Sequence, residues 1–435
     1  MKWMGGGVTA ARGFRAAGFT AGIKPSRRPD LALVLADRPV TAVGVFTRNR
    51  IQAAPVQLSR QRLRTGTARA VFINSGCANC LTGVAGLRDA RTLSRSVARA
   101  LGLPDRAVLV ASTGIIGTRI PVAKVQRAIP TLVKRLSRRD HRAAATGILT
   151  TDRVPKEAAV SSRIGGRIVH VGGMAKGAGM IAPSMATMLC VLTTDAAASP
   201  AVLRGILRQA VAASFNQISV DDDMSTNDTV FALASGHSGV RIRPGGVAYQ
   251  TVARMVQAVT RRLALAIVED GEGATRVAEI RVVGARTDAQ AQRCARQVAG
   301  SSLVKTMLAG GDPNVGRIAA AVGASGVLFR PQRLEISLNG HRLVAHGRAV
   351  PIAPRLSRTL LAGRPPRPAF RGDPDGRRFT GRPPRPAFRG DPDGRRFTGR
   401  RVDIRIHLRA GRGTGRMLST DLTEAYVRIN ARYIT

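Results

Sequence analysis

The sequence predicts a mixed α and β protein with a large core. Short apolar runs with the composition of buried strands alternate with alanine-rich stretches that favour helices. The chain has 435 residues, of which 44% are hydrophobic. A chain of this length and composition can bury a large core, and it allows two or three domains.

Five segments carry the clearest local signals. In chain order, the alanine-rich segments 88–100 and 201–213 favour helices, and the short apolar runs 107–110, 168–171 and 280–283 favour strands. No run approaches the roughly 18 to 20 apolar residues that cross a membrane. The N-terminus has no apolar signal core. We therefore expect a cytoplasmic protein without a membrane span.

The four cysteines give little sign of a metal centre. Cys77 and Cys80 have a C-x-x-C spacing, but a structural zinc site needs a second pair, and Cys190 and Cys294 stand alone. None of the six histidines forms an H-E-x-x-H pair. We expect buried free thiols in a reducing compartment and no metal.

The net charge of +43 would ordinarily indicate a nucleic-acid-binding protein. Only seven of the 69 basic residues are lysine, and arginine, alanine, glycine and proline are all abundant, as a GC-rich genome would encode. Aromatic residues make up 3%, which leaves few platforms for stacking bases. We expect non-specific attraction to polyanions and no specific nucleic acid. A basic polyanion-binding protein remains an alternative to the enzyme hypotheses below.

A perfect tandem repeat interrupts the C-terminal part. Residues 363–380 read GRPPRPAFRGDPDGRRFT, and residues 381–398 repeat them. Their proline, glycine and arginine content predicts a surface loop without fixed structure. A basic anion-binding arm is the alternative. We favour a tolerated insertion between strand pieces at 334–338 and 402–406, because long surface insertions cost little closure entropy.

One threonine has the surroundings of a nucleophile. The small, turn-rich segment 175–186 runs into Thr187, and the apolar run 188–192 that follows is typical of a buried strand. If the Ala186–Thr187 bond is cut, Thr187 carries a free α-amine beside its own hydroxyl, so base and nucleophile share one residue. An ordinary strand entry after a Pro/Gly loop is the alternative.

The whole chain resembles the ornithine acetyltransferases, also called glutamate N-acetyltransferases, of arginine biosynthesis. The string KGAGMIAPSMATML at 176–189 is long and specific. Further segments match in order from end to end, apart from the repeat. They are GGVT at 6–9 with GFRAAG at 13–18, NSGCAN at 74–79, STGIIG at 112–117, STNDT at 225–229, DGEGAT at 270–275 and INARYIT at 429–435.

This resemblance implies an α/β (α+β) fold of the Ntn-like type, a layered sandwich of β-sheets flanked by helices. It also implies self-cleavage into an alpha fragment, residues 1–186, and a beta fragment, residues 187–435, assembled as a heterotetramer of two alpha and two beta fragments. The implied reaction moves an acetyl group from N-acetylornithine to glutamate through an acetyl-Thr187 intermediate, with ping-pong kinetics and no cofactor. Acetyl-CoA as a further acetyl donor, which would make the enzyme bifunctional, is left open. The runner-up is a self-cleaving aminopeptidase or amidase of similar fold that uses water as acceptor.

The resemblance also assigns the site residues. Thr113 and Gly114 match the oxyanion hole, where a hydroxyl and a backbone N–H suit the developing charge; a plain glycine turn after the strand 107–110 is the alternative. The substrate-binding positions are Lys176 for a carboxylate, Glu272 for an ammonium group, one of Thr150 and Thr151, Thr187 itself, and Asn430 and Thr435 of the tail. Without the matching motifs, Lys176 and Glu272 would be solvated charges and Asn430 a cap.

A few positions depart from the family pattern. Asp222 and Met224 stand where the family usually has glycine and threonine, and Val315 where tryptophan is common. Ser419 and Thr420 replace the usual Gly-Cys. Because none of these is Thr187, Thr113 or Gly114, we expect effects on affinity and stability before effects on the reaction.

Overall fold

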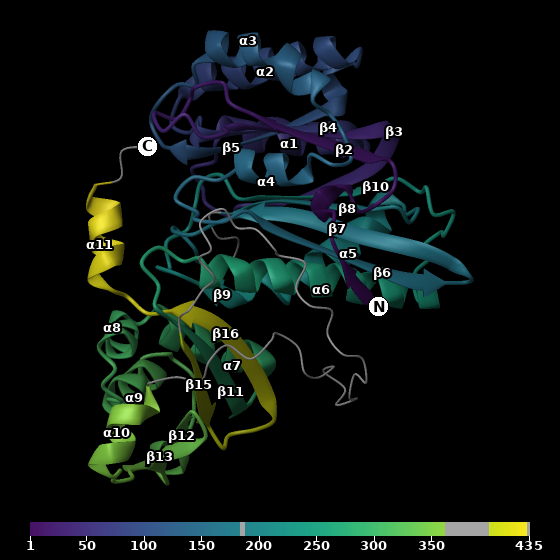
Figure 1. The fold of residues 1–435 in the computed structure, drawn as a ribbon. Helices are drawn as coiled ribbons and strands as arrows, with labels where there is room; N and C mark the ends of the chain where they lie inside the picture. Colours follow the sequence, from purple (N-terminus) through teal and green to yellow (C-terminus); the bar gives the residue numbers. More distant parts are fainter. Residues whose placement is uncertain (183–187, 362–399, 433–435) are drawn as a thin grey trace. The chain divides into compact units, whose positions relative to one another are not determined.

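The computed structural model describes residues 1–182, 188–361 and 400–432 (Figure 1). The predicted scissile bond between Ala186 and Thr187, the terminal Thr435 and the repeat 363–398 lie outside these residues. The chain forms two compact units. Among the described residues, unit 1 comprises 1–182, 188–216 and 223–267, and unit 2 comprises 217–222, 268–361 and 400–432. The predicted boundary between the two fragments falls within the range of unit 1.

Unit 1 contains a nine-stranded sheet with the order β1-β6-β7-β8-β10-β3-β4-β5, and β2 pairs with β3 beside this path. The long strand β3 joins the two halves of the sheet, because it pairs with β10 along its second part and with β2 and β4 along its first. The strands are β1 (Lys2–Met4), β2 (Phe14–Phe19), β3 (Leu31–Phe46), β4 (Thr67–Cys77), β5 (Val108–Ile115), β6 (Lys156–Ile164), β7 (Arg167–Lys176), β8 (Leu189–Thr194) and β10 (Thr229–Ala234).

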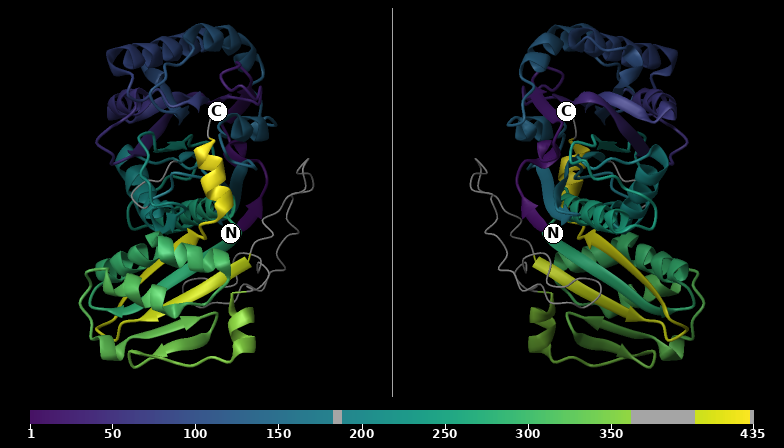
Figure 2. Two further views of the ribbon diagram at one scale, coloured as in Figure 1. Left: turned by 90° about the vertical axis from the view of Figure 1, so that its left-hand side faces the viewer. Right: turned by 90° about the vertical axis from the view of Figure 1, so that its right-hand side faces the viewer.

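The two halves of this sheet pack face to face between helices. Alternate residues of β3 show why: Ala32 and Val34 face the core between the sheet halves, whereas Leu31 and Leu33 face the core under α2 and α3. Helices α5 and α6 cover the outer face of β7, β8 and β10 (Figures 1 and 2). The helices are α1 (Ala54–Arg62), α2 (Gly83–Leu101), α3 (Val122–Lys134), α4 (His141–Gly147), α5 (Pro200–Ala212) and α6 (Val247–Glu269).

This four-layer order confirms the predicted mixed α and β sandwich flanked by helices. The expected helices at 88–100 and 201–213 lie in α2 and α5, and the expected strands lie in β5, β7 and β11 (Arg276–Ala285). The apolar run that begins at residue 188 becomes β8. One alternative was wrong: Thr113 and Gly114 do not form a turn after a strand, because β5 continues to Ile115.

Unit 2 contains a seven-stranded sheet with the order β14-β13-β12-β15-β11-β16-β9. Alternate apolar residues of β11 and β15 pack against α7, α8 and α9 in one core. The remaining strands are β9 (Ile218–Ser219), β12 (Glu335–Leu338), β13 (His341–Ala345), β14 (Arg348–Ala349), β15 (Arg400–His407) and β16 (Gly413–Thr420). The helices are α7 (Asp288–Gly300), α8 (Ser302–Gly310), α9 (Val315–Gly323), α10 (Pro354–Leu360) and α11 (Glu424–Ala431).

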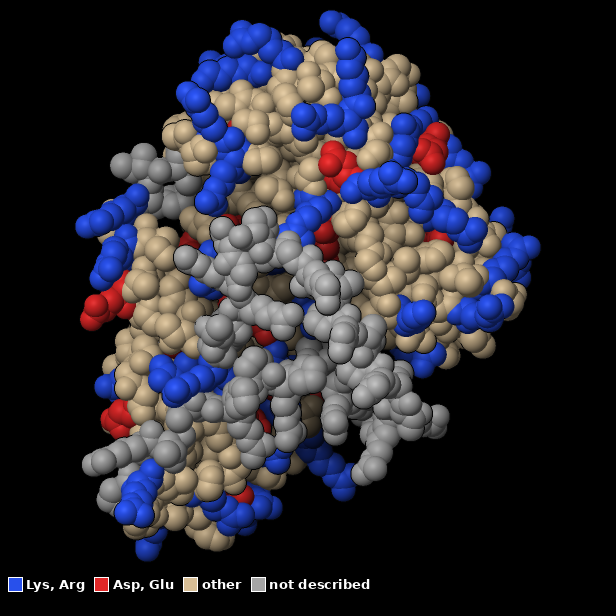
Figure 3. All heavy atoms as spheres, in the orientation of Figure 1, with Lys and Arg blue, Asp and Glu red and all other residues tan. Residues whose placement is uncertain are grey.

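Basic side chains are distributed unequally between surface and interior. Lysine and arginine are scattered over the face shown in Figure 3 and do not gather in one patch. Among the described arginines only Arg62 is buried, yet four of the seven lysines are buried, namely Lys24, Lys156, Lys176 and Lys305. All four cysteines are buried free thiols, as expected. Within residues 1–182, 188–361 and 400–432, no helix is long and apolar enough to cross a membrane.

Candidate active site

The predicted oxyanion pair lies at the end of β5, where it runs parallel to β4. Gly114 pairs with Gly76 in this register, and both have positive φ angles, +131° and +100°. A Cβ on Gly114 would lie 2.3 Å from the carbonyl carbon of Gly76, so only glycine fits there. The two strands therefore approach more closely than side chains would allow, and this approach fixes the direction of the Gly114 backbone.

The residue before Thr113 is held in place by a network of polar side chains. This residue, Ser112, donates from its hydroxyl to Asn74 Oδ1 at 2.6 Å. Its carbonyl accepts from Asn227 Nδ2 at 2.8 Å, and the same nitrogen donates to the Ala78 carbonyl at 2.7 Å. Asn227 thus joins the ends of β4 and β5. Thr113 itself is buried, and its hydroxyl makes no hydrogen bond within the described part of the chain.

The residue after Asn227 connects this network to the chain that follows the predicted nucleophile. Asp228 Oδ1 accepts from the backbone N–H of Met188 at 3.0 Å. Burial raises the pKa of Asp228 well above its usual value, although the hydrogen bond from Met188 and the charge of Lys176 act in the opposite direction. The STNDT motif identifies this segment in the sequence but predicts no role for Asn227 or Asp228. Polar residues directly before an apolar strand, β10, were the available signal.

A buried ionic cluster surrounds Lys176 at the end of β7. Asp152 Oδ1 lies 2.6 Å from Lys156 Nζ and accepts from the Gly177 N–H at 2.7 Å, and its other oxygen lies 3.7 Å from Lys176 Nζ. Burial alone would raise the pKa of Asp152, but the charges of Lys156 and Lys176 outweigh it and hold this pKa well below its usual range. Asp152 is therefore an anion that fixes two buried ammonium groups.

The structure brings Thr150 to this cluster. Lys176 Nζ donates to Thr150 Oγ1 at 2.8 Å, and the Thr150 N–H donates to Asp152 Oδ2 at 3.2 Å. No such bond joins Thr151 to Lys176 in the described residues. Lys176 is only 2% exposed, so the alternative of a solvated charge is wrong. Sequence reasoning singled out Lys176 but missed Lys156 and Asp152 as its partners.

Glu272 and Asn430 meet within unit 2. Asn430 Nδ2 donates to Glu272 Oε2 at 2.8 Å. Gly273 (φ +67°) makes this approach feasible, because a Cβ there would lie 2.5 Å from the Tyr426 nitrogen in α11. The Thr423 hydroxyl also donates to the Gly273 carbonyl at 2.8 Å. Glu272 is buried, so its alternative as a solvated charge is wrong, whereas Asn430 is exposed near the end of α11.

Two departures from the family pattern have structural explanations. Asp222 has a φ of +64°, a conformation that favours the glycine usual there. Ser419 and Thr420 receive hydrogen bonds from the buried Lys305, whose Nζ lies 3.2 Å from each hydroxyl and 2.6 Å from the Thr420 carbonyl. Nothing in the structure explains Met224 or Val315.

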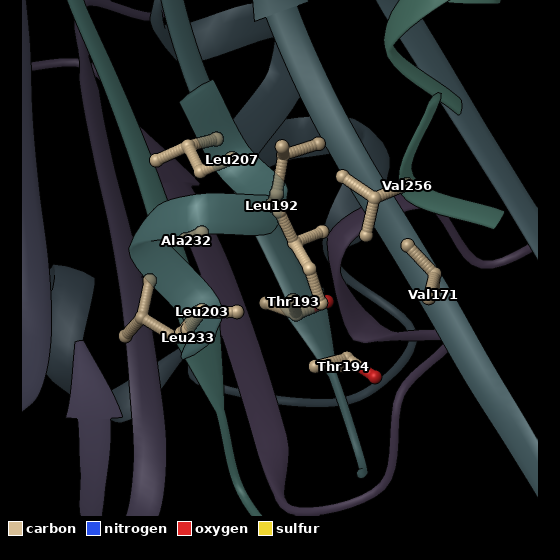
Figure 4. A pocket seen from close by; sticks show the side chains of 10 residues that line it. Val171, Leu192, Thr193, Thr194, Leu203, Leu207, Ala232, Leu233 and Val256 are labelled. Carbon is tan, nitrogen blue, oxygen red and sulfur yellow. The ribbon is translucent and has the colours of Figure 1, made fainter. Parts of the chain in front are cut away.

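A small apolar pocket between the outer helices and the sheet of unit 1 contains none of these candidate residues (Figure 4). Leu203 and Leu207 of α5 and Val256 of α6 line it together with strand residues. Its hydroxyls are already engaged: Thr193 donates to the Val8 carbonyl and Thr194 to the His170 carbonyl. The pocket is therefore a gap in core packing that offers a ligand no polar partner.

Comparisons with known proteins agree on one family. The ArgJ family model matches residues 15–365. The arginine biosynthesis bifunctional protein ArgJ of Thermosynechococcus vestitus is 45% identical over 99% of this chain and 98% of its own, and that of Gloeobacter violaceus is 42% identical over 100% and 99%. A solved structure of ornithine acetyltransferase complexed with ornithine, from Mycobacterium tuberculosis, is 46% identical over 41% of this chain and 95% of its own, with a TM-score of 0.39.

The family model and the curated relatives define the class of the protein, an acetyltransferase of arginine biosynthesis. The chain belongs to the ArgJ family.

Proposed function

We propose that the chain transfers the acetyl group of N-acetylornithine to glutamate through an acetyl-threonine intermediate on Thr187. One observation carries this proposal. Consecutive residues tie the predicted oxyanion donors to the predicted nucleophile: Asn227 binds the carbonyl of Ser112, which precedes Thr113, and Asp228 binds the N–H of Met188, which follows Thr187. A nucleophile and an oxyanion hole must be fixed relative to each other if both are to act on one carbonyl.

The nucleophile would be generated by cleavage of the chain itself. The Thr187 hydroxyl attacks the carbonyl carbon of Ala186, the C–N bond breaks, and the α-amine of Thr187 takes up a proton. Water then opens the resulting ester and releases the Ala186 carboxylate. The two products are fragments 1–186 and 187–435, and we propose that two copies of each form the active enzyme.

In the catalytic cycle the free α-amine of Thr187 accepts the hydroxyl proton while the oxygen attacks the acetyl carbonyl. The Thr113 hydroxyl and the Gly114 N–H stabilise the oxyanion, and ornithine leaves with the proton. The α-amine of glutamate then attacks the acetyl ester through a second oxyanion and restores the Thr187 hydroxyl. Splitting one transfer into two steps through a covalent ester gives ping-pong kinetics.

Substrate recognition would use charges of opposite sign. Lys176 binds the carboxylate and Thr150 supports it through the 2.8 Å bond between them. Glu272 binds the ammonium group and Asn430 orients its carboxylate, while Thr435 contributes from the tail. We propose that the reaction needs no cofactor and takes place in the cytoplasm. The word bifunctional in the relatives' names supports a second reaction in which acetyl-CoA supplies the acetyl group.

The runner-up, an aminopeptidase or amidase, would pass the acyl group to water. The family supports the transferase, and a simple assay separates the two. If the proposal is right, N-acetylornithine is consumed continuously only when glutamate is present. Steady hydrolysis without glutamate would favour the runner-up.

The cleavage itself is tested on a denaturing gel with N-terminal sequencing of each band. In proportion to their lengths, the two parts of the 46.0 kDa chain should migrate at about 20 and about 26 kDa. The larger should begin Thr-Met-Leu-Cys. The matched control is Thr187→Ala, which should stay a single chain. A wild-type chain that stays intact on incubation would contradict the proposed nucleophile.

A further inference from the structure

Lys24 is a buried ammonium group without a carboxylate partner. It is only 7% exposed, and its Nζ donates to the Leu149 carbonyl at 3.0 Å. Within the described chain this is its one hydrogen bond, and no carboxylate oxygen lies within ion-pair distance of it. An ammonium group has three N–H bonds to donate, and a buried cation without a partner is costly. Two of the three N–H bonds of the Lys24 ammonium group therefore have no acceptor within the described chain.

The surroundings of Lys24 fix its position firmly. The carboxylate of the buried Asp30 accepts from the backbone N–H groups of Ala21 and Ile23, each at 2.6 Å, and thereby shapes the loop that carries Lys24. On the other side, a Cβ on Gly76 would lie 2.8 Å from Lys24 Cγ, so the lysine stem runs across the glycine that pairs with Gly114.

Lys24 and Lys176 serve the same short segment. Lys24 Nζ binds the carbonyl of Leu149, and Lys176 Nζ binds the hydroxyl of the next residue, Thr150. The charge of Lys176 also acts on Lys24. Lys24 therefore lies beside the predicted carboxylate-binding lysine and against the strand ends that hold the predicted oxyanion donors.

Lys305 in unit 2 is an instructive contrast. It is similarly buried, 3% exposed, but its ammonium donates to three acceptors, the hydroxyls of Ser419 and Thr420 and the Thr420 carbonyl. Such a lysine is fully satisfied and holds elements together. Lys24 is also buried but has only one acceptor within the described chain. This difference indicates that Lys24, unlike Lys305, can donate to a bound ligand.

We propose that Lys24 is a second cation of the substrate site, which binds the α-carboxylate of the amino-acid substrates together with Lys176. A carboxylate has two oxygens and can accept from both ammonium groups at once. N-acetylornithine and glutamate share the α-carboxylate, so the same pair would serve both halves of the reaction. The inference rests on the proposed function.

The charges around Lys24 predict how this site depends on pH. Burial is the largest cause that lowers the pKa of Lys24, and Lys176 and Arg28 lower it further, while Asp30 and Asp152 raise it; the result is about 8. Above this pH Lys24 loses its charge and becomes a weaker donor to a carboxylate. KM for a carboxylate substrate should therefore rise as the pH passes 8.

The experiment compares Lys24→Met in the full-length, self-cleaved enzyme with Lys134→Met, the same change at an exposed position at the end of α3. Losing one charge-assisted hydrogen bond should raise KM for N-acetylornithine and for glutamate by about 10- to 100-fold. kcat should change by less than about threefold, because the carboxylate is bound equally in ground and transition states. Lys134→Met should behave as wild type. Unchanged KM values, or a loss confined to kcat, would overturn the proposal.

A measurement on the wild-type enzyme keeps the proposal testable even if Lys24→Met fails to fold. N-acetylornithine and its α-amide share the side-chain amine and differ only at the carboxylate, so the ratio of their KM values isolates that group. The acid should bind more tightly than the amide at pH 7, and its advantage should shrink above pH 8. Equal KM values for the acid and the amide at pH 7 would overturn the proposal. If wild type transfers no acetyl group, the proposed function fails separately, and calorimetric binding of N-acetylornithine and its amide gives the same ratio.

Discussion

Gly114 is the residue of the candidate site that we expect to tolerate substitution least. Gly114→Ala would place a Cβ 2.3 Å from a backbone carbon of Gly76, which cannot move without displacing β4. The Gly114 N–H would then leave the position it needs for an oxyanion, and we expect kcat for acetyl transfer to fall about a hundredfold or more.

Steady-state kinetics of Gly114→Ala should be compared with Gly117→Ala. Gly117 also has a positive φ, +88°, but a Cβ there meets nothing within 4 Å. Both variants place a side chain at a positive φ, which costs about 1 kcal/mol or more, but only Gly114→Ala also meets backbone atoms of β4. Equal kcat values for the two variants would contradict a special role of Gly114.

Asp152 should matter for stability as much as for binding. Asp152→Asn leaves Lys156 and Lys176 buried without their anion, and breaking such a buried pair typically costs about 3 to 5 kcal/mol. The pKa of Asp152 is lowered in the folded state, so its contribution is present above about pH 4 and is lost as the pH falls further. Urea unfolding at pH 7 should show the loss. Between pH 5 and pH 3 the variant should lose less stability than wild type.

Asp37→Asn is the matched control for Asp152. Asp37 pairs with Arg15 at 3.2 Å, but both side chains are nearly half exposed. Such a surface pair contributes about 0 to 1 kcal/mol. If Asp152→Asn costs no more than Asp37→Asn, the buried cluster does not stabilise unit 1.

At the scale of elements, Lys305 fastens α8 to the end of β16 in unit 2. Ser419 and Thr420, which replace the Gly-Cys usual in the family, both accept hydrogen bonds from its ammonium group. Thr420→Val keeps the side-chain shape but leaves the buried ammonium one acceptor short, so we expect a loss of about 1 to 3 kcal/mol in unfolding free energy. KM and kcat should not change.

Thermal melts of Thr420→Val should be compared with Thr414→Val, the same change on the same strand at an exposed position. The exposed variant should unfold at the wild-type temperature. A Tm of Thr420→Val equal to that of wild type would show that the serine hydroxyl and the threonine carbonyl satisfy Lys305 without the missing group.

The sequence predicted the helices and strands better than it predicted the burial and the partners of individual side chains. Periodicity and composition located β5, β7, β11, α2 and α5 because these signals are local. The burial of Lys176 could not be predicted in this way, since its carboxylate partner Asp152 stands 24 residues earlier and reaches it only through the β6–β7 hairpin. The contacts of Lys24 and Asn227 could not be predicted for the same reason: their acceptors, Leu149 and Ser112, come from distant segments.

The motifs predicted membership of the family and the identity of the candidate residues, but not how these residues are held. Gly114 stands in a glycine-containing motif that favours a turn, and the structure extends a strand through it because Gly76 on β4 offers a backbone partner without a side chain. Such a pairing depends on two segments 38 residues apart, which no local pattern contains.

At the scale of the whole molecule, the net charge of +43 is carried mainly by exposed arginines, whereas the candidate site contains buried lysines. The interior relies on lysine, whose ammonium is compact and can lose its proton when buried, whereas the described arginines other than Arg62 stay in contact with water. Arginines scattered over the surface attract any polyanion but have no arrangement that would select a base sequence.

We therefore expect the protein to bind duplex DNA without sequence preference and with a steep dependence on salt. Fluorescence anisotropy with two unrelated duplexes of equal length should give equal Kd values. If six or more phosphates are neutralised, affinity should fall about a thousandfold or more between 50 and 200 mM salt. Acetyl transfer at 200 mM salt should proceed at the same rate with and without DNA, because Lys176 is buried and DNA contacts only the surface. Tight binding of one duplex that survives 200 mM salt would instead indicate a nucleic-acid function separate from the enzyme.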